Sequence, residues 1–237
     1  KIYFAIKNIY SMTESSVRLC NNVQSEWFST LYGVRQGDSL SPTLFAVYIN
    51  DLATEIKKLN NGIHVNGRVI DILMYADDIV LIAPSEEMLQ SMLNTVYEWS
   101  VKWCIDVNKR KSKIVHFRKN SVEHSNFQFK CGESVLDYVT SYKYLGVTMS
   151  ESLNYNENAD LVSQAAGRAL GSIIAKYKMH KYMGYSTFTK LYESCVCPVM
   201  EYSAGVWGYD KFNKLDTIQN RASRVFLGVH RFAPLLA

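Results

Sequence analysis

The sequence has few of the residues that mark secreted, membrane-spanning or zinc-binding proteins. Its 237 residues include only four prolines, five histidines and five cysteines, an odd number of cysteines with no Cys-x-x-Cys pair. These counts give no zinc pattern and favour a reduced, intracellular protein over a disulfide framework. No apolar run reaches the roughly 18 residues of a transmembrane helix, so no membrane association is expected. The chain begins with Lys1–Phe4 rather than an initiator Met, which indicates a piece of a longer chain.

Charge of either sign is unevenly spread along the chain. Residues 1–100 carry 7 Lys/Arg and 11 Asp/Glu, whereas residues 101–237 carry 19 and 11, so the two parts have net charges of −4 and +8. An acidic part that gathers divalent metal and a basic part that meets phosphate would suit a polymerase, although solvated helix faces explain the same distribution. Hydrophobic residues make up 48% of the chain, which argues against disorder and allows one large or two small domains.

Hydrophobic spacing and turn residues predict an α+β fold, with strands and helices up to about residue 150 and helices thereafter. Helical spacing of apolar residues predicts helices over residues 2–10, 42–59, 84–103, 157–178, 186–197 and 214–227. Short apolar runs predict strands over 17–20, 27–31, 105–107, 113–117 and 144–147, with turns at Asn21-Asn22 and Asn66-Gly67. The change to helices places a domain boundary near residue 150.

Capping residues indicate where several of these helices begin or end. Ser41 is expected to cap the second helix, with Pro42 as its first residue. The acids Glu86-Glu87 follow Ser85 in the first turn of the next helix, where the helix dipole favours them. Pro198 is expected to end a later helix, and Gly228 is expected to cap the last one.

The sharpest chemical signal is the acid pair Asp77-Asp78 within the apolar run Ile72–Ile82. Burying two adjacent carboxylates without partners is very costly, so a core strand would not tolerate them. The cost falls if they lie at the tip of a tight hairpin, and it falls further beside cations. Carboxylate oxygens suit Mg²⁺, with Mn²⁺ as the alternative. The dipeptide alone also fits a plain turn between strands, but the flanking Tyr75-Ala76 and the apolar runs favour a functional pair.

Four short motifs occur in a characteristic order. Gly33–Pro42 reads Gly-Val-Arg-Gln-Gly-Asp-Ser-Leu-Ser-Pro, and Tyr75–Asp78 reads Tyr-Ala-Asp-Asp. Asn108–Lys113 and Tyr144–Gly146 follow. In this order they resemble motifs B, C, D and E of the reverse transcriptases of non-LTR (LINE-type) retrotransposons. Glu201-Tyr202, Trp207 and Ile218–Ala222 resemble the region after the polymerase core of such proteins.

The resemblance implies a role for each matching residue. Asp77 would be a metal ligand, and Asp78 a second ligand or its electrostatic support, in two-metal nucleotidyl transfer. Lys111 would act near the phosphates, although one solvated lysine in a basic run is the alternative. By resemblance the template and nucleotide would meet Arg35, Gln36 and Gly37, and the primer would meet Tyr75, Tyr144, Leu145 and Gly146. An ordinary buried strand is the alternative for residues 144–146.

The fold implied by the resemblance is a partial right-hand polymerase palm over residues 1–150, with an antiparallel sheet and packed helices, followed by a helical thumb over residues 151–237. The implied activity is RNA-directed DNA synthesis from deoxynucleoside triphosphates on an RNA template with a DNA primer, in the nucleus. The thumb residues expected to face the duplex backbone are Arg168, Lys176, Lys178 and Lys181, unless they only solvate a helix face. The oligomeric state stays open.

The chain departs from the family pattern before Gly33. Motif A should supply a further catalytic aspartate there, but no Asp precedes Gly33, and Glu14 and Glu26 are the only acids. Because two metals need ligands from both motifs, the isolated chain is expected not to polymerise. One alternative is a non-catalytic nucleic-acid-binding remnant of a retroelement. A second alternative is a reverse transcriptase of the group II intron or retron type, which the Gly33–Gly37 motif and the Trp207 region disfavour. A third is an unrelated metal-dependent nuclease, which would leave motif B unexplained.

Overall fold

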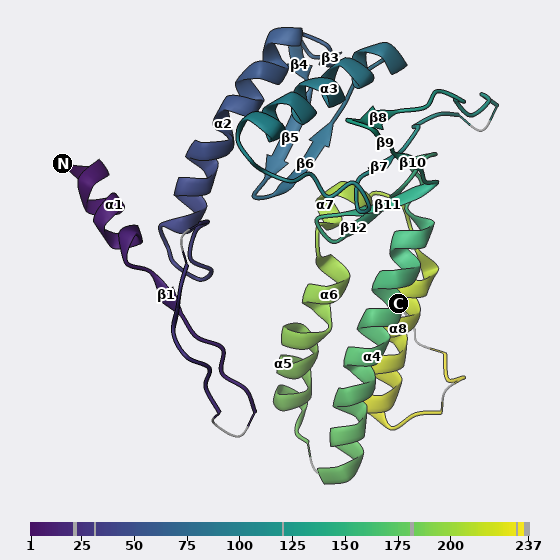
Figure 1. Cartoon of the computed structure of the whole chain (residues 1–237). Helices are drawn as coiled ribbons and strands as arrows, with labels where there is room; N and C mark the ends of the chain where they lie inside the picture. Colours follow the sequence, from purple (N-terminus) through teal and green to yellow (C-terminus); the bar gives the residue numbers. More distant parts are fainter. Residues whose placement is uncertain (21–22, 31, 120, 181–182, 231, 235–237) are drawn as a thin grey trace. The chain divides into compact units, whose positions relative to one another are not determined.

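The computed structural model describes residues 1–20, 23–30, 32–119, 121–180, 183–230 and 232–234. These residues form two compact units, residues 1–107 with 130–132 and residues 108–129 with 133–237. Helices and strands occur in both units, as predicted for the α+β class (Figure 1). No helix in the described ranges is long and apolar enough to cross a bilayer. This division does not test the assignment of palm and thumb, which stays a prediction.

The first unit opens with helix α1 (Ile2–Ser11), strand β1 (Glu14–Ser15) and strand β2 (Phe28–Ser29). Helix α1 confirms the predicted helix, and β2 lies within the second predicted strand. The predicted strand over 17–20 is wrong, because the Val17 amide donates to the Ser25 hydroxyl at 2.8 Å and leaves only an isolated bridge between Arg18 and Gln24. The predicted turn Asn21-Asn22 and Leu31 lie outside the described residues.

Two long helices and two hairpins follow in this unit. Their bounds are α2 (Ser41–Leu59), β3 (Ile63–Val65), β4 (Arg68–Ile70), β5 (Ile72–Tyr75), β6 (Asp78–Leu81) and α3 (Glu86–Lys102). Asn66 and Gly67 have φ angles of +49° and +75°, the left-handed pair of a type I′ turn, which confirms the predicted turn. The Ser85 hydroxyl accepts the Met88 amide and caps α3. Strand β8 (Lys130–Cys131) packs on α3.

The core of the first unit lies between α2, α3 and one face of the β5–β6 hairpin. Leu52, Ile56 and Met92 are at most 1% exposed. Full burial of such a side chain contributes about 1.5–3 kcal/mol. The remaining members of this core are Ile49, Val96 and Trp99, with Phe45, Leu59, Ile72, Met74, Ile79, Leu81, Ala83, Trp103, Ile105 and Val107 packed against them.

The predicted strand over residues 105–107 is wrong. Helix α3 ends before Trp103, and Cys104 has a left-handed φ of +54° that turns the chain. The amide of Ile105 then donates to the carbonyl of Ser100 at 3.0 Å instead of to a partner strand. The apolar spacing that suggested a strand is explained by Ile105 and Val107, which pack against the helix core from an irregular segment.

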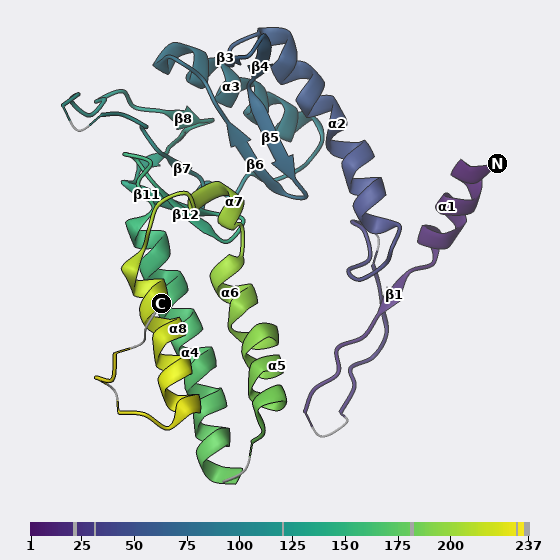
Figure 2. The ribbon, with the colours of Figure 1, turned by 180° about the vertical axis from the view of Figure 1, so that it is seen from behind.

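In the second unit, the described residues form short strands followed by five helices. Strand β7 (Lys113–Ile114) pairs in parallel with β10 (Asp137–Tyr138), and β11 (Ser141–Tyr144) pairs antiparallel with β12 (Val147–Ser150). Strand β9 is Ser134–Val135. The helices are α4 (Asn156–His180), α5 (Tyr185–Cys195), α6 (Cys197–Glu201), α7 (Ala204–Trp207) and α8 (Asn213–Leu227), which Figure 2 shows from behind.

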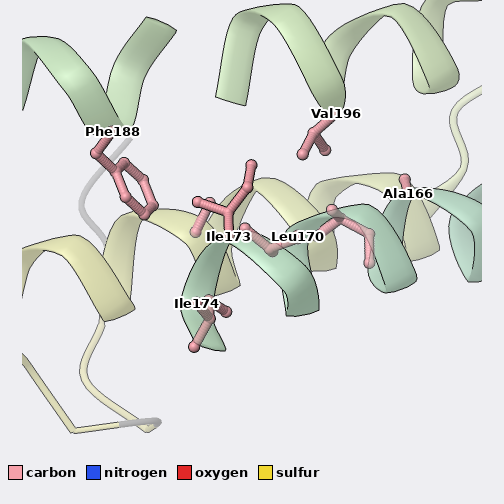
Figure 3. Close-up of a cluster of buried hydrophobic side chains, with 8 residues drawn as sticks. Ala166, Leu170, Ile173, Ile174, Phe188 and Val196 are labelled. Atoms are coloured by element: carbon pink, nitrogen blue, oxygen red, sulfur yellow. The ribbon is translucent and has the colours of Figure 1, made fainter. Parts of the chain in front are cut away.

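Side chains of α4, α5 and α8 form the larger core of the second unit. Figure 3 shows Leu170 and Ile173 of α4 together with Phe188 of α5 in this cluster. Prediction located these three helices to within a few residues but missed α6 and α7. Pro198 lies in the first turn of α6 rather than at the end of a helix, because a proline there gives up an amide that has no intrahelical partner. Gly228, with φ +66°, caps α8 as predicted.

We expect Leu52→Ala to lower the free energy of unfolding by about 2–5 kcal/mol, because it removes buried methyl groups and leaves a cavity between α2 and α3. Val47→Ala on the same helix is the control, since Val47 is 70% exposed, and it should change stability by no more than about 0.5 kcal/mol. Urea unfolding followed by tryptophan fluorescence measures both values. Equal effects of the two substitutions would contradict the assigned core.

Candidate active site

The acid pair lies at the turn of hairpin β5–β6. Tyr75 pairs with Asp78, which leaves Ala76 and Asp77 as a two-residue turn. Ala76 has a φ of +50°, a left-handed conformation that costs a residue other than glycine about 1–2 kcal/mol. Strain of this kind often occurs at functional sites. The expected hairpin is therefore present, with Asp77 in its turn and Asp78 as the first residue of β6.

The two faces of this hairpin differ in burial. Residues that pair across strands share a face. The pairs Ile72–Leu81 and Met74–Ile79 pack against the helix core, whereas Leu73 and Tyr75 on the other face are 45% and 65% exposed. Because Asp78 pairs with Tyr75, it lies on the face turned away from the helices, where water or a bound molecule can reach it.

Both carboxylates of the pair are exposed. None of the side-chain hydrogen bonds or salt bridges formed within the described residues engages the carboxylate of Asp77 or Asp78. Mg²⁺ is usually held by one or two carboxylates together with waters and substrate phosphates, so this donor set fits such an ion. Over the described ranges, no three His, Cys, Asp or Glu side chains gather into a metal-binding group.

Sequence reasoning missed a third acid of the hairpin, Asp71, which is only 4% exposed. Its carbonyl oxygen accepts the amide of Ile82 at 2.8 Å, and its Oδ1 accepts the amide of Ile72 at 2.7 Å. These bonds close the end of the hairpin opposite the acid pair. The available signal was an Asp directly before a strand, since Asp side chains bond nearby backbone amides.

The Gly33–Pro42 loop is held to α1 through Arg35. Its Nη2 donates to the carbonyl of Ile9 at 2.7 Å and to Thr13 Oγ1 at 2.9 Å, and its guanidinium lies 5.4 Å from the Tyr10 ring centroid. Gln36 is exposed. Gly37 has a φ of +84° with open space around its Cβ position, so conformation rather than crowding requires glycine there. Contact of these residues with template or nucleotide stays a prediction.

The predicted N-cap role of Ser41 is wrong. Helix α2 begins at Ser41 itself, and its cap position is Leu40 without a side-chain cap bond. The Ser41 hydroxyl donates instead to the carbonyl of Arg35 at 2.6 Å. Asp38, which sequence reasoning did not single out, accepts the amide of Leu40 through Oδ1 and the hydroxyl of Tyr10 through Oδ2, both at 3.2 Å. The polar residues of this loop therefore bond to one another and to α1.

Lys111 lies in a turn of the second unit that hydrogen bonds to Asn108 close. The Asn108 Oδ1 and carbonyl oxygen both accept the Lys111 amide, at 3.2 and 3.1 Å. The hydroxyl of Tyr142 on β11 donates to the carbonyl of Lys111 at 3.2 Å. The backbone at Lys111 is thus held from two sides while the residue is exposed. Its catalytic role stays a prediction.

The prediction of one strand through residues 144–147 is wrong, because its two central residues form a turn. Tyr144 ends β11, Val147 begins β12, and Leu145 and Gly146 between them have φ angles of +45° and +86°. Both positive angles are those of a type I′ turn, which matches the right-handed twist of the strands. Leucine in this conformation costs about 1–2 kcal/mol. Leu145 and Gly146 therefore do not continue the strand that ends at Tyr144, and primer binding by Tyr144–Gly146 stays a prediction.

Three of the four basic residues predicted to meet duplex are described. Arg168, Lys176 and Lys178 are exposed on α4, the helix that also carries the buried Leu170 and Ile173. None of them takes part in the salt bridges formed within the described ranges. Lys181 lies outside the described residues.

Comparison with known proteins bears on the assignment of these motifs. Residues 2–149 match the family described as reverse transcriptase (RNA-dependent DNA polymerase). The match contains the Gly33–Pro42 loop, the acid pair, Lys111 and the turn at Leu145-Gly146. It ends before the helices of the second unit. An unrelated nuclease is therefore excluded, and the sequence order of the motifs agrees with the match.

Curated relatives come from mobile elements. The chain is 26% identical over 202 residues, 81% of its length, to a probable RNA-directed DNA polymerase from transposon BS of Drosophila melanogaster. It is 27% identical over 205 residues, 83% of its length, to the RNA-directed DNA polymerase from mobile element jockey of Drosophila funebris. It is 30% identical over 132 residues, 52% of its length, to a Pol polyprotein from type-1 retrotransposable element R2 of Nasonia vitripennis.

The match covers only part of these relatives. It spans 22% of each of the first two proteins and 13% of the third. The family match nevertheless extends over more than half of this chain, and the relatives belong to the class of element predicted from motifs B to E. The chain therefore belongs to the reverse transcriptase family, and the relatives that it matches are proteins of non-LTR retrotransposons.

Proposed function

We propose that the protein containing this chain copies RNA into DNA, joining a deoxynucleoside triphosphate to a primer 3′-hydroxyl, with Asp77 and Asp78 as ligands of Mg²⁺ or Mn²⁺. The observation that carries the proposal is an exposed carboxylate pair at a strained hairpin turn, with neither carboxylate in a hydrogen bond or salt bridge to any described residue. Divalent ions bound there would stabilise the attacking and leaving oxygens of the displacement. Family membership supports divalent-metal chemistry of this kind.

Other residues would bind and orient the substrates. Tyr75, on the same hairpin face as Asp78, would lie beside the primer end. The Leu145-Gly146 turn would hold the primer strand with Tyr144 beside it. The backbone of Lys111 is anchored by Asn108 and Tyr142. Its ammonium group would lie near the phosphates and donate a proton to the leaving pyrophosphate.

The template and the incoming nucleotide would meet the loop that contains Arg35, Gln36 and Gly37. The guanidinium of Arg35 binds α1 in this structure, so Arg35 would act by fixing the conformation of the loop. We also propose that residues 1–150 act as part of a polymerase palm and residues 151–237 as its thumb. The site of action would be the nucleus, where chromosomal DNA supplies the primer.

We propose that the chain of 237 residues does not polymerise by itself. The motif A aspartate that a two-metal site requires has no counterpart among residues 1–32. Activity is therefore expected only from a longer protein that joins these residues to such an aspartate.

In such a longer protein, Asp77→Asn should lower primer extension on an RNA template by at least about a hundredfold, because it removes a charged group that the transition state needs. Binding of the primed template should change little, since the Asp77 carboxylate makes no hydrogen bond or salt bridge within the described residues. Radiolabelled primer extension and fluorescence anisotropy measure the two properties.

The matched control is Asp51→Asn, which neutralises an exposed aspartate of α2 in the same unit. It should leave both extension and binding unchanged. Full extension by the Asp77→Asn variant would overturn the assignment of Asp77. Loss of extension in both variants would mean that charge in general, rather than this pair, is needed.

A non-catalytic nucleic-acid-binding module is the second candidate function, and the exposed basic residues of α4 favour it. If Arg168, Lys176 and Lys178 bind phosphates, affinity for an RNA–DNA hybrid should fall with salt. Replacing all three with Gln should then reduce the slope of log K against log[salt] by about 0.7–0.9 for each phosphate that the variant no longer neutralises. Lys58→Gln is the control, because Lys58 already pairs with Glu55 at 2.7 Å.

Titration of a labelled hybrid at several salt concentrations gives these slopes. An unchanged slope for the triple variant would contradict binding of the duplex by α4. A wild-type affinity that does not depend on salt would rule out phosphate binding altogether.

A further inference from the structure

The turn between β11 and β12 is held by a residue from outside the segment that matches the family. The hydroxyl of Tyr202, which follows α6, donates to the carbonyl of Leu145 at 3.0 Å. A Cβ added to Gly146 would lie 2.8 Å from Cε1 of Tyr202, so the ring rests directly on the glycine. The family match ends at residue 149. Tyr202 therefore contacts both residues of the turn from beyond that match.

Tyr202 is itself fixed to the core of the second unit. Its carbonyl accepts Nε1 of Trp207 at 2.8 Å. Trp207 is 1% exposed and packs in one cluster with Val147, Tyr155 and Ala159. Val147 is the residue directly after the turn, so the same cluster anchors both the turn and the residue that covers it.

The backbone on either side of Tyr202 is arranged to place its ring. Helix α6 ends at Glu201, and Ser203 adopts a left-handed φ of +52° before α7 begins. Tyr202 between them has φ and ψ angles of −56° and 120° and is 55% exposed. An exposed tyrosine with a bonded hydroxyl and a bonded carbonyl is more constrained than a solvated side chain. Its contacts stabilise a turn whose first residue is leucine rather than the asparagine, aspartate or glycine that such turns favour.

We propose that Tyr202 is a positioning residue that fixes the Leu145-Gly146 turn for contact with the primer strand. The inference rests on the proposed function, which assigns primer binding to this turn. The tyrosine acts through the turn: its hydroxyl orients the Leu145 carbonyl, and its ring limits movement of Gly146. The C-terminal helices would thereby set the conformation of a primer-contacting element of the family domain.

The direct test compares Tyr202→Phe with Tyr209→Phe in the 237-residue chain. Tyr202→Phe keeps the ring but removes the hydroxyl that bonds Leu145, so amide hydrogen exchange in residues 141–150 should become about two- to tenfold faster. Tyr209→Phe removes a hydroxyl from a tyrosine that is 69% exposed in the same unit and should leave this exchange unchanged. Unchanged exchange in Tyr202→Phe would contradict the proposal that the Tyr202 hydroxyl stabilises the turn.

Binding of a primed template tests the positioning role. Tyr202→Phe should weaken affinity for an RNA template annealed to a DNA primer by about two- to tenfold, with affinity for the unprimed RNA unchanged. Equal affinity of the variant and the wild type for the primed template would refute the inference even if exchange is faster. If the wild type binds primed and unprimed RNA equally, the proposed primer binding by this chain is wrong. The exchange result then still decides whether Tyr202 stabilises the turn.

Substitution of Gly146 gives an independent check. Gly146→Ala should lower the melting temperature because of its φ of +86° and the nearby Tyr202 ring. Tyr202→Ala relieves the ring contact but not the backbone strain, so the two losses should be less than additive. Gly171→Ala in α4, where a Cβ meets nothing within 4 Å, should raise the melting temperature. Additive losses for the first pair would contradict contact between the ring and the turn.

Discussion

The proposed chemistry depends on one constraint: two neighbouring negative charges must be held outside an apolar core while attached to it. Hairpin β5–β6 meets this constraint because one of its faces packs on α2 and α3 and the other stays exposed. Asp71 closes one end of the hairpin through two backbone amides. At the other end, the left-handed Ala76 turns the chain so that Asp77 and Asp78 stay accessible. Burial elsewhere in the hairpin thus offsets the strain at its turn.

A similar arrangement recurs in the second unit. The turn at Leu145-Gly146 is strained by a leucine with positive φ, and contacts from Tyr202 hold it in place. Tyr142, three residues before Leu145 on the same hairpin, bonds the backbone at Lys111. In both units, therefore, a functional candidate lies at a tight turn whose conformation the residues around it enforce. Such turns provide exposed groups in fixed positions, which is what binding of a nucleic-acid strand requires.

Much of this could be predicted from the sequence, but only where local chemistry decides the structure. Asn66-Gly67 and Gly228 were predictable because few other residues accept positive φ. The prediction of one strand through residues 144–147 was wrong, since Leu145 adopts a turn conformation that leucine disfavours. Contacts from Tyr202 stabilise that conformation. The same holds for Ser41, whose hydroxyl bonds Arg35 rather than its own helix. Family motifs located the acid pair, whereas the partners that hold each turn depend on tertiary contacts that spacing does not encode.

The most direct test of the central claim is a titration of the isotope-labelled chain with Mn²⁺, followed by paramagnetic broadening of backbone amide signals. An accessible carboxylate pair predicts that the amides of residues 75–79 broaden first, and that this effect is lost in the Asp77→Asn, Asp78→Asn double variant. The amide of Asp51, beside another exposed carboxylate of the same unit, should broaden only at much higher Mn²⁺ concentration. Equal broadening at Asp51 and at the acid pair, or broadening that survives the double substitution, would contradict a metal-binding role for the hairpin turn.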